Sequence, residues 1–78
     1  MADTFLITGA TQGIGLATAR MLLADGHTVV GIARSARPEF EGPFFAADLA
    51  DRNMTAVALA EVTARYDIDG IVNCAGLN

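Results

Sequence analysis

The 78-residue sequence has little cysteine and few basic residues, and each shortage excludes a class of protein. Its one cysteine, Cys74, cannot form a disulfide within the chain and fits a reducing compartment, where we expect it to be a small core residue. Five basic against nine acidic residues leave no basic patch to hold a nucleic acid. No apolar run approaches the ~18 residues of a membrane span, and no signal-peptide pattern begins the chain. We therefore expect a cytoplasmic protein that binds neither nucleic acid nor membrane.

What the sequence does contain fits one small α/β domain over residues 1–78. Hydrophobic residues make up 53% of the chain and eight residues are glycine, which suits a compact core of helices and strands. A chain of this length buries only about 60–65% of its unfolded surface. We therefore expect marginal stability.

Glycine is concentrated near the amino terminus, where Gly9, Gly13 and Gly15 follow the apolar run at residues 4–7. A turn from a buried strand into a helix favours glycine because the chain must turn sharply, approach a ligand and pack the helix close to the sheet. The helix that follows would point its free N–H groups at the turn, which makes a site for a pyrophosphate. The stretch predicts a nucleotide-binding turn, with a purely structural turn as the alternative.

Two segments have the apolar spacing of amphipathic helices. The first is expected over about residues 13–24 and ends at Gly26, which can take the left-handed conformation that closes a helix. The second is expected over about residues 51–66. The residues predicted to form the apolar faces are Ile14, Ala17, Met21 and Leu22 in the first helix, and Met54, Val57, Leu59, Ala60 and Val62 in the second.

Apolar runs predict three further strands, at residues 28–33, 44–47 and 70–75. Residues 34–43 contain two prolines and no helical periodicity, and we expect mostly loop there. Alternating strands and helices predict a parallel sheet with right-handed crossovers and the strand order 3-2-1-4. The fold class is therefore α/β, a Rossmann-type doubly wound sheet of which this chain holds the first four strands. His27, the only histidine, falls at the amino edge of that sheet, where we expect a surface role.

Four segments follow the carboxyl ends of the predicted strands. In an open α/β sheet a ligand lies outside those ends, at the switch point between the first and fourth strands. We therefore expect the four segments to meet at one crevice. They are residues 9–15, 34–35, 48–49 and 73–76.

Motifs in three of these segments resemble those of the short-chain dehydrogenase/reductase family. Residues 8–15 resemble its TGxxxGIG cofactor turn, Asp48 and Leu49 resemble the acidic residue and its partner beside the adenine, and residues 73–76 resemble its NNAG strand end, with Cys74 in place of the second asparagine. The resemblance implies a nicotinamide dinucleotide as cofactor. The residues predicted to bind it are Gly9, Thr11, Gln12, Gly13, Ile14, Gly15, Arg34, Ser35, Asp48, Leu49, Asn73, Ala75 and Gly76.

Arg34 predicts which nicotinamide cofactor is bound. An acidic residue after the second strand would accept hydrogen bonds from the ribose 2′-OH of NAD, whereas an arginine accommodates the 2′-phosphate of NADP. Arg34 stands there, with Ser35 as a further donor and Arg37 nearby. We therefore expect NADP rather than NAD, the alternative being a solvated loop arginine.

No catalytic residue and no metal ligand is assigned to this chain. The resemblance places the catalytic Ser, the Tyr-x-x-x-Lys pair and the catalytic Asn after the NNAG segment. The only tyrosine, Tyr66, has Gly70 four residues on, and the chain contains no lysine. We therefore expect the cofactor-binding portion of an oxidoreductase that moves a hydride between the nicotinamide and a carbonyl or alcohol substrate.

The partner expected for this chain is the missing C-terminal half or a companion chain, and the complete enzyme is expected to be a homo-oligomer. Two other functions stay open at this point. One is a stand-alone, non-catalytic nucleotide-binding module or inactive fragment. The other is a methyl-donor enzyme, which also uses a glycine-rich turn, but there an acidic residue would be expected in the place of Arg34.

Overall fold

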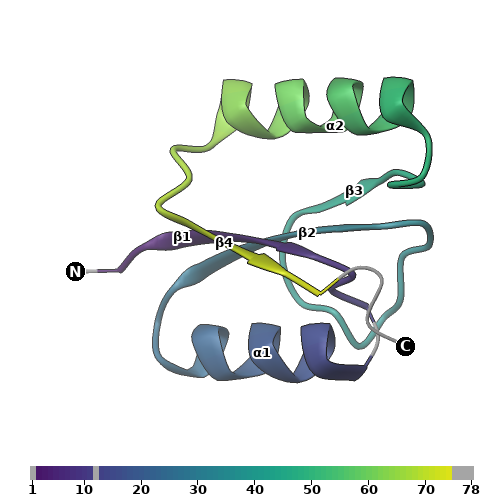
Figure 1. Cartoon of the computed structure of the whole chain (residues 1–78). Helices are drawn as coiled ribbons and strands as arrows, with labels where there is room; N and C mark the ends of the chain where they lie inside the picture. The colour runs from purple at the N-terminus through teal and green to yellow at the C-terminus, as the bar shows by residue number, and fades with distance from the viewer. Residues whose placement is uncertain (1, 12, 75–78) are drawn as a thin grey trace.

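Four parallel strands form a sheet with a helix on each face (Figure 1). The computed structural model describes residues 2–11 and 13–74. In chain order the elements are β1 (Thr4–Thr8), α1 (Gly13–Ala24), β2 (Thr28–Ala33), β3 (Phe44–Ala46), α2 (Arg52–Arg65) and β4 (Gly70–Asn73). The strand order is β3-β2-β1-β4 and every neighbouring pair is parallel, which confirms the predicted topology. Within the described residues, β3 ends one residue earlier than predicted, and β4 ends at Asn73, so Cys74 follows the strand instead of lying in it as predicted.

Side chains that alternate along the strands divide the core into two layers. Because the register pairs Leu6 with Val30 and Ile7 with Gly31, residues at one level of β1 and β2 point to the same face. The layer under α2 consists of Leu6, Val30, Ile32, Ala47, Ala58 and Val62. The layer over α1 consists of Ile7, Ala10, Ala19, Val29, Phe40 and Cys74. Because both faces of the sheet are buried, the sequences of β1 and β2 are continuous apolar runs. The presence of Cys74 in the second layer confirms it as a core residue.

The helix α1 turns small residues toward the sheet, which corrects its predicted face. Its buried residues are Gly15 and Ala19, whereas Ile14 and Met21 are 65% and 70% exposed. Ala17 is exposed too, and of the predicted face only Leu22 is partly buried against the core. Because glycine and alanine let the helix backbone approach the sheet closely, the larger side chains are left on its flanks.

The helix α2 shows the same departure from its predicted face. It buries Ala58 and Val62, of which only Val62 was predicted. The other predicted face residues, Met54, Val57, Leu59 and Ala60, are exposed. Within the described part of the chain, neither this helix nor α1 is long and apolar enough to cross a membrane.

The carboxyl end of α1 is closed by Gly26, as the sequence predicts. Gly26 has φ +87°, in the left-handed region. Its N–H donates to the Leu23 carbonyl and the His27 N–H donates to the Leu22 carbonyl, both at 3.0 Å. These two bonds form a Schellman motif, which satisfies carbonyls that the end of a helix leaves free.

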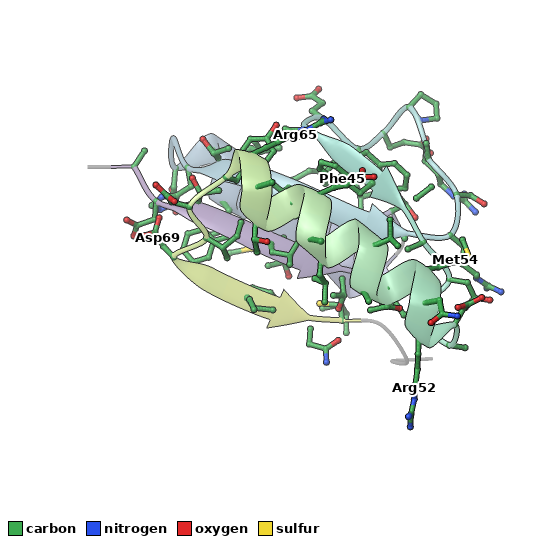
Figure 2. All side chains as sticks on the ribbon, turned by 90° about the horizontal axis from the view of Figure 1, so that it is seen from above. Phe45, Arg52, Met54, Arg65 and Asp69 are labelled. Atoms are coloured by element: carbon green, nitrogen blue, oxygen red, sulfur yellow. The ribbon has the colours of Figure 1, made fainter. Side chains whose placement is uncertain are left out.

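The helix α2 is fixed at both of its ends. At its start the Asp51 carboxylate accepts hydrogen bonds from the N–H groups of Asn53 at 2.9 Å and Met54 at 3.1 Å, which is the geometry of an N-cap. Near its end the guanidinium of Arg65 lies over the Phe45 ring of β3, 5.8 Å from the centroid (Figure 2). These contacts orient α2 along the sheet.

Polar groups fix the amino edge of the sheet. The Asp3 N–H donates to His27 Nδ1 at 3.1 Å, and the Thr4 N–H donates to Asp69 Oδ2 at 2.8 Å. The rings of Phe5 and His27 meet edge to face, with centroids 5.2 Å apart. His27 therefore lies at the amino edge as predicted, but it is half-buried and holds β1 in place.

Candidate nucleotide-binding edge

Hydrogen bonds join the carboxyl ends of the four strands into one edge. They run from the Cys74 N–H to the Thr8 carbonyl at 3.1 Å, from the Gly9 N–H to the Ile32 carbonyl at 2.8 Å, and from the Ala47 N–H to the Ala33 carbonyl at 2.9 Å. The described parts of the four predicted segments therefore follow strand ends that lie side by side. Figure 1 shows that both helices begin at this edge.

The three glycines of the turn have different local geometries. Gly9 and Gly13 have φ values of +68° and +50°, in the left-handed region that favours glycine. Among the described residues outside its own helix turn, none would lie within 4 Å of a Cβ on Gly13, so these residues leave the start of α1 open to a ligand. A Cβ on Gly15 would overlap the carbonyl oxygen of Gly9. Gly9 thus allows the sharp turn, Gly13 leaves space for a ligand, and Gly15 lets the helix pack closely against the turn.

The other residues predicted in the turn differ in how far they can reach a ligand. Ile14 is 65% exposed in the first turn of α1, whereas Thr11 is only 6% exposed and can present little surface. Gln12 lies outside the described residues, and so do Ala75 and Gly76 of the fourth predicted segment.

Thr8, the first residue of the glycine-turn motif, is a site residue to which the sequence analysis assigned no role. Its hydroxyl donates to Asn73 Oδ1 at 2.6 Å and accepts a hydrogen bond from the Cys74 N–H at 3.1 Å. The side chain thereby ties the end of β1 to the end of β4 and orients the Asn73 amide. The sequence could have indicated this contact, because Thr8 and Asn73 end neighbouring parallel strands and are paired in the register.

Arg34 and Ser35 directly follow β2, and both are exposed. Among the described residues, neither side chain forms a hydrogen bond or an ion pair. Arg37, three residues on, is also exposed. The end of β2 therefore carries two arginines and a hydroxyl that are available to an anion.

Asp48 and Leu49 follow β3 and are both half-buried. Asp48 Oδ1 accepts a hydrogen bond from the Ala50 N–H at 3.0 Å, an Asx turn that leads into α2. Leu49 packs against the core layer under α2. This apolar side chain beside a fixed carboxylate has the chemistry to receive a nucleobase.

A family model described as short chain dehydrogenase matches residues 3–78. The chain belongs to the short-chain dehydrogenase family. The predicted family is thereby confirmed.

Similar proteins span much more sequence than this short-chain dehydrogenase segment. Serine 3-dehydrogenase of Agrobacterium fabrum is 41% identical over 88 residues, which cover 99% of this chain and 34% of that protein. A short-chain dehydrogenase structure from Streptomyces avermitilis is 36% identical with a TM-score of 0.85, covering 97% of this chain and 31% of that one. A structure described as an NADH-dependent reductase complexed with NAD is 28% identical with a TM-score of 0.75, covering 92% and 35%. The chain spans about a third of these relatives.

Membership of the short-chain dehydrogenase family implies a nicotinamide dinucleotide as cofactor. The residues present fit such a group, because the open space at Gly13 adjoins the amino terminus of the twelve-residue helix α1. Helix amino termini attract phosphate through their free N–H groups and dipole. Open space and positive potential thus coincide at the glycine turn.

Proposed function

We propose that this chain is the NADP-binding portion of an oxidoreductase that transfers a hydride between the nicotinamide and a carbonyl or alcohol substrate. The observation that carries the cofactor choice is Arg34, which is exposed at the end of β2 and has no partner among the described residues. An arginine at this place accommodates a 2′-phosphate, whereas NAD is held there by a carboxylate.

A similar structure is described as NADH-dependent and complexed with NAD, so this fold is compatible with NAD. We therefore base the choice between NADP and NAD on the side chains that follow β2. In this chain those side chains are Arg34, Ser35 and Arg37, and no carboxylate stands among them.

Each segment of the edge has a separate task in holding the cofactor. Gly9, Gly13 and the start of α1 would bind the pyrophosphate, Asp48 and Leu49 would receive the adenine, and Asn73 would lie beside the nicotinamide half. When bound, the nicotinamide supplies or accepts the hydride, and the protein positions it.

The proposal is tested on the completed protein, by which we mean this chain joined to or mixed with the portion that carries the catalytic residues of the family. A charge-assisted contact contributes about 1.5–3 kcal/mol, or about ten- to a hundredfold in affinity. Titration should therefore show NADP bound more tightly than NAD by that factor, and Arg34→Asp should abolish or reverse the preference.

A matched control is Arg52→Asp, which changes the charge equally. Arg52 is exposed in the first turn of α2, and Figure 2 shows its side chain extending away from the fold. This variant should keep the NADP preference. Equal affinities in the parent protein, or an unchanged preference in Arg34→Asp, would contradict the assignment.

The partner of this chain is proposed to be the remaining portion of the enzyme, docked along β4. Among the described strands, β4 pairs only with β1, and Ile71 on it is 67% exposed. An exposed apolar edge strand is a template for another strand. The chain alone should therefore aggregate or melt without cooperativity, and adding the remaining portion in trans should restore cofactor binding. A cooperative melt of the monomeric chain, with ketone reduction by NADPH unaided, would refute this.

A further inference from the structure

The connection between β2 and β3 crosses one face of the sheet without a helix. Parallel neighbours need a crossover, usually helical, yet residues 34–43 contain none. One large side chain of this connection enters the core. Phe40 is 8% exposed and packs in the layer over α1, while its neighbours Glu39 and Glu41 are exposed. Phe40 therefore takes the place of a crossover helix in covering the sheet.

The Phe40 ring fills a hollow that Gly31 leaves free. A Cβ built on Gly31, in the middle of β2, would lie 2.6 Å from Phe40 Cζ and 2.9 Å from Cε2. A Cβ on Gly42 would lie 2.7 Å from the Val29 carbonyl oxygen, so this glycine lets the connection approach β2 closely. The Phe44 ring meets the Phe40 ring at an interplanar angle of 63°, with centroids 6.2 Å apart. The ring is thus held in the space that the missing side chain of Gly31 provides.

A backbone hydrogen bond connects this anchor to Arg37. The Phe40 N–H donates to the Arg37 carbonyl at 3.1 Å, which closes a turn with Pro38 at its second position. At the other end, Arg34 follows directly on β2. The segment from Arg34 to Arg37 is therefore held at both ends, by the end of β2 and by the turn next to the buried Phe40 ring.

The anchor is the point at which this connection reaches the core. An open groove of 390 Å³ separates the connection from the second half of α1. Its lining residues are Leu16, Ala19, Arg20, Leu23 and Ala24 of α1 together with Glu39, Phe40 and Glu41. Removal of the ring would therefore leave residues 35–39 with little to hold them against the protein.

We propose that Phe40 is a positioning residue for the choice of cofactor: its ring, seated over Gly31, holds the segment that carries Ser35 and Arg37 at the carboxyl edge of β2. This inference rests on the proposed binding of NADP. A loop held in its binding conformation loses little entropy when the phosphate arrives. Where only a fraction of molecules has the competent conformation, the apparent affinity falls by that fraction.

The test is separate titration of the completed Phe40→Ala protein with NADP⁺ and NAD⁺. If the anchored conformation drops to about a tenth of the molecules, the affinity for NADP⁺ falls about tenfold. The affinity for NAD⁺, which has no 2′-phosphate to contact this segment, should change by less than about twofold. The ratio of the two affinities is the informative readout, because a merely structural role would lower both affinities alike.

Two further variants check that the ring itself is responsible. Gly31→Ala places a methyl where the Phe40 ring lies, so it should lower the affinity ratio as Phe40→Ala does; the methyl also lies 3.0 Å from the Ala10 Cβ, so the ratio rather than either affinity is the readout. Phe40→Leu keeps an apolar side chain in the hollow and should retain part of the ratio, which also provides a test should Phe40→Ala fail to fold. The matched control is Phe45→Ala, since Phe45 packs on the opposite face of the sheet and its loss should leave the ratio unchanged.

The outcomes separate this inference from the proposed function. A parent protein that prefers NADP⁺, loses the preference in Arg34→Asp and keeps it in both Phe40→Ala and Gly31→Ala would overturn the role of Phe40 alone. A parent with equal affinities for the two cofactors would overturn the cofactor assignment and the role of Phe40 together.

Discussion

Gly15→Ala should destabilise the protein, although the same change in a helix ordinarily stabilises it. The added Cβ would overlap the Gly9 carbonyl oxygen, and it would lie 2.9 Å from the Gly9 carbonyl carbon and 3.3 Å from the Ala10 Cα. All three are backbone atoms, so no side-chain rotation relieves the clash. Since carbon atoms pack at about 3.5–4.0 Å and the overlap with the oxygen is tighter still, α1 or the turn must move by about 1 Å or more.

The sign of the effect follows from two opposing magnitudes. Overpacking costs about 1–3 kcal/mol, and a clash with backbone lies at the upper end of that range. Replacing glycine by alanine within a helix gains about 1 kcal/mol of helix propensity. The expected net loss is therefore about 2 kcal/mol, which lowers the Tm of a protein of 150–250 residues by about 4–8 °C.

Thermal unfolding of the completed protein measures this loss, with Ala17→Gly as the control. Ala17 is exposed on the same helix, so the reverse substitution there should cost only the propensity, about 1 kcal/mol. A Tm for Gly15→Ala equal to or above that of the parent would refute the argument that this glycine allows α1 to approach the turn.

Two other substitutions test the glycine turn and the start of α2. Gly13→Val places a side chain in the open space where we expect the pyrophosphate, so cofactor affinity should fall further than the strain of about 1–2 kcal/mol at φ +50° accounts for; equal losses of binding and stability would mean that Gly13 serves only the fold. Asp51→Ala removes the acceptor of two helix N–H groups and should cost about 0.5–2 kcal/mol in denaturant unfolding, whereas Asp51→Asn, which keeps an acceptor, should stay near the parent.

The strands and their order could be predicted because strands buried on both faces are continuous apolar runs in the sequence. The run at residues 28–33 is β2 to the residue, and the predicted start and end of α1 coincide with the structure. The segments expected at the carboxyl edge do follow neighbouring strand ends, because parallel topology alone brings them there.

The helix faces could not be predicted from hydrophobicity, because close approach selects small residues. Ala19 and Ala58 are buried while Met21 and Val57 are exposed, the reverse of their order in size and apolar surface. Phe40 was missed for a related reason, since a single aromatic residue in a loop has no periodicity. Gly31 was the available signal, because a glycine inside an otherwise apolar strand marks the close approach of another group.

The contacts of Asp3 and Thr4 at the amino edge have a practical use for labelling and immobilisation. They fix the start of β1 at the end of the sheet opposite the glycine turn, and the five residues of β1 span about 17 Å. A fluorophore, affinity tag or surface linker joined at Ala2, which is exposed, would sit one strand length from the ligand edge. A label at Ala2 would lie at a known distance from the bound cofactor and would not block the cofactor from reaching the glycine turn.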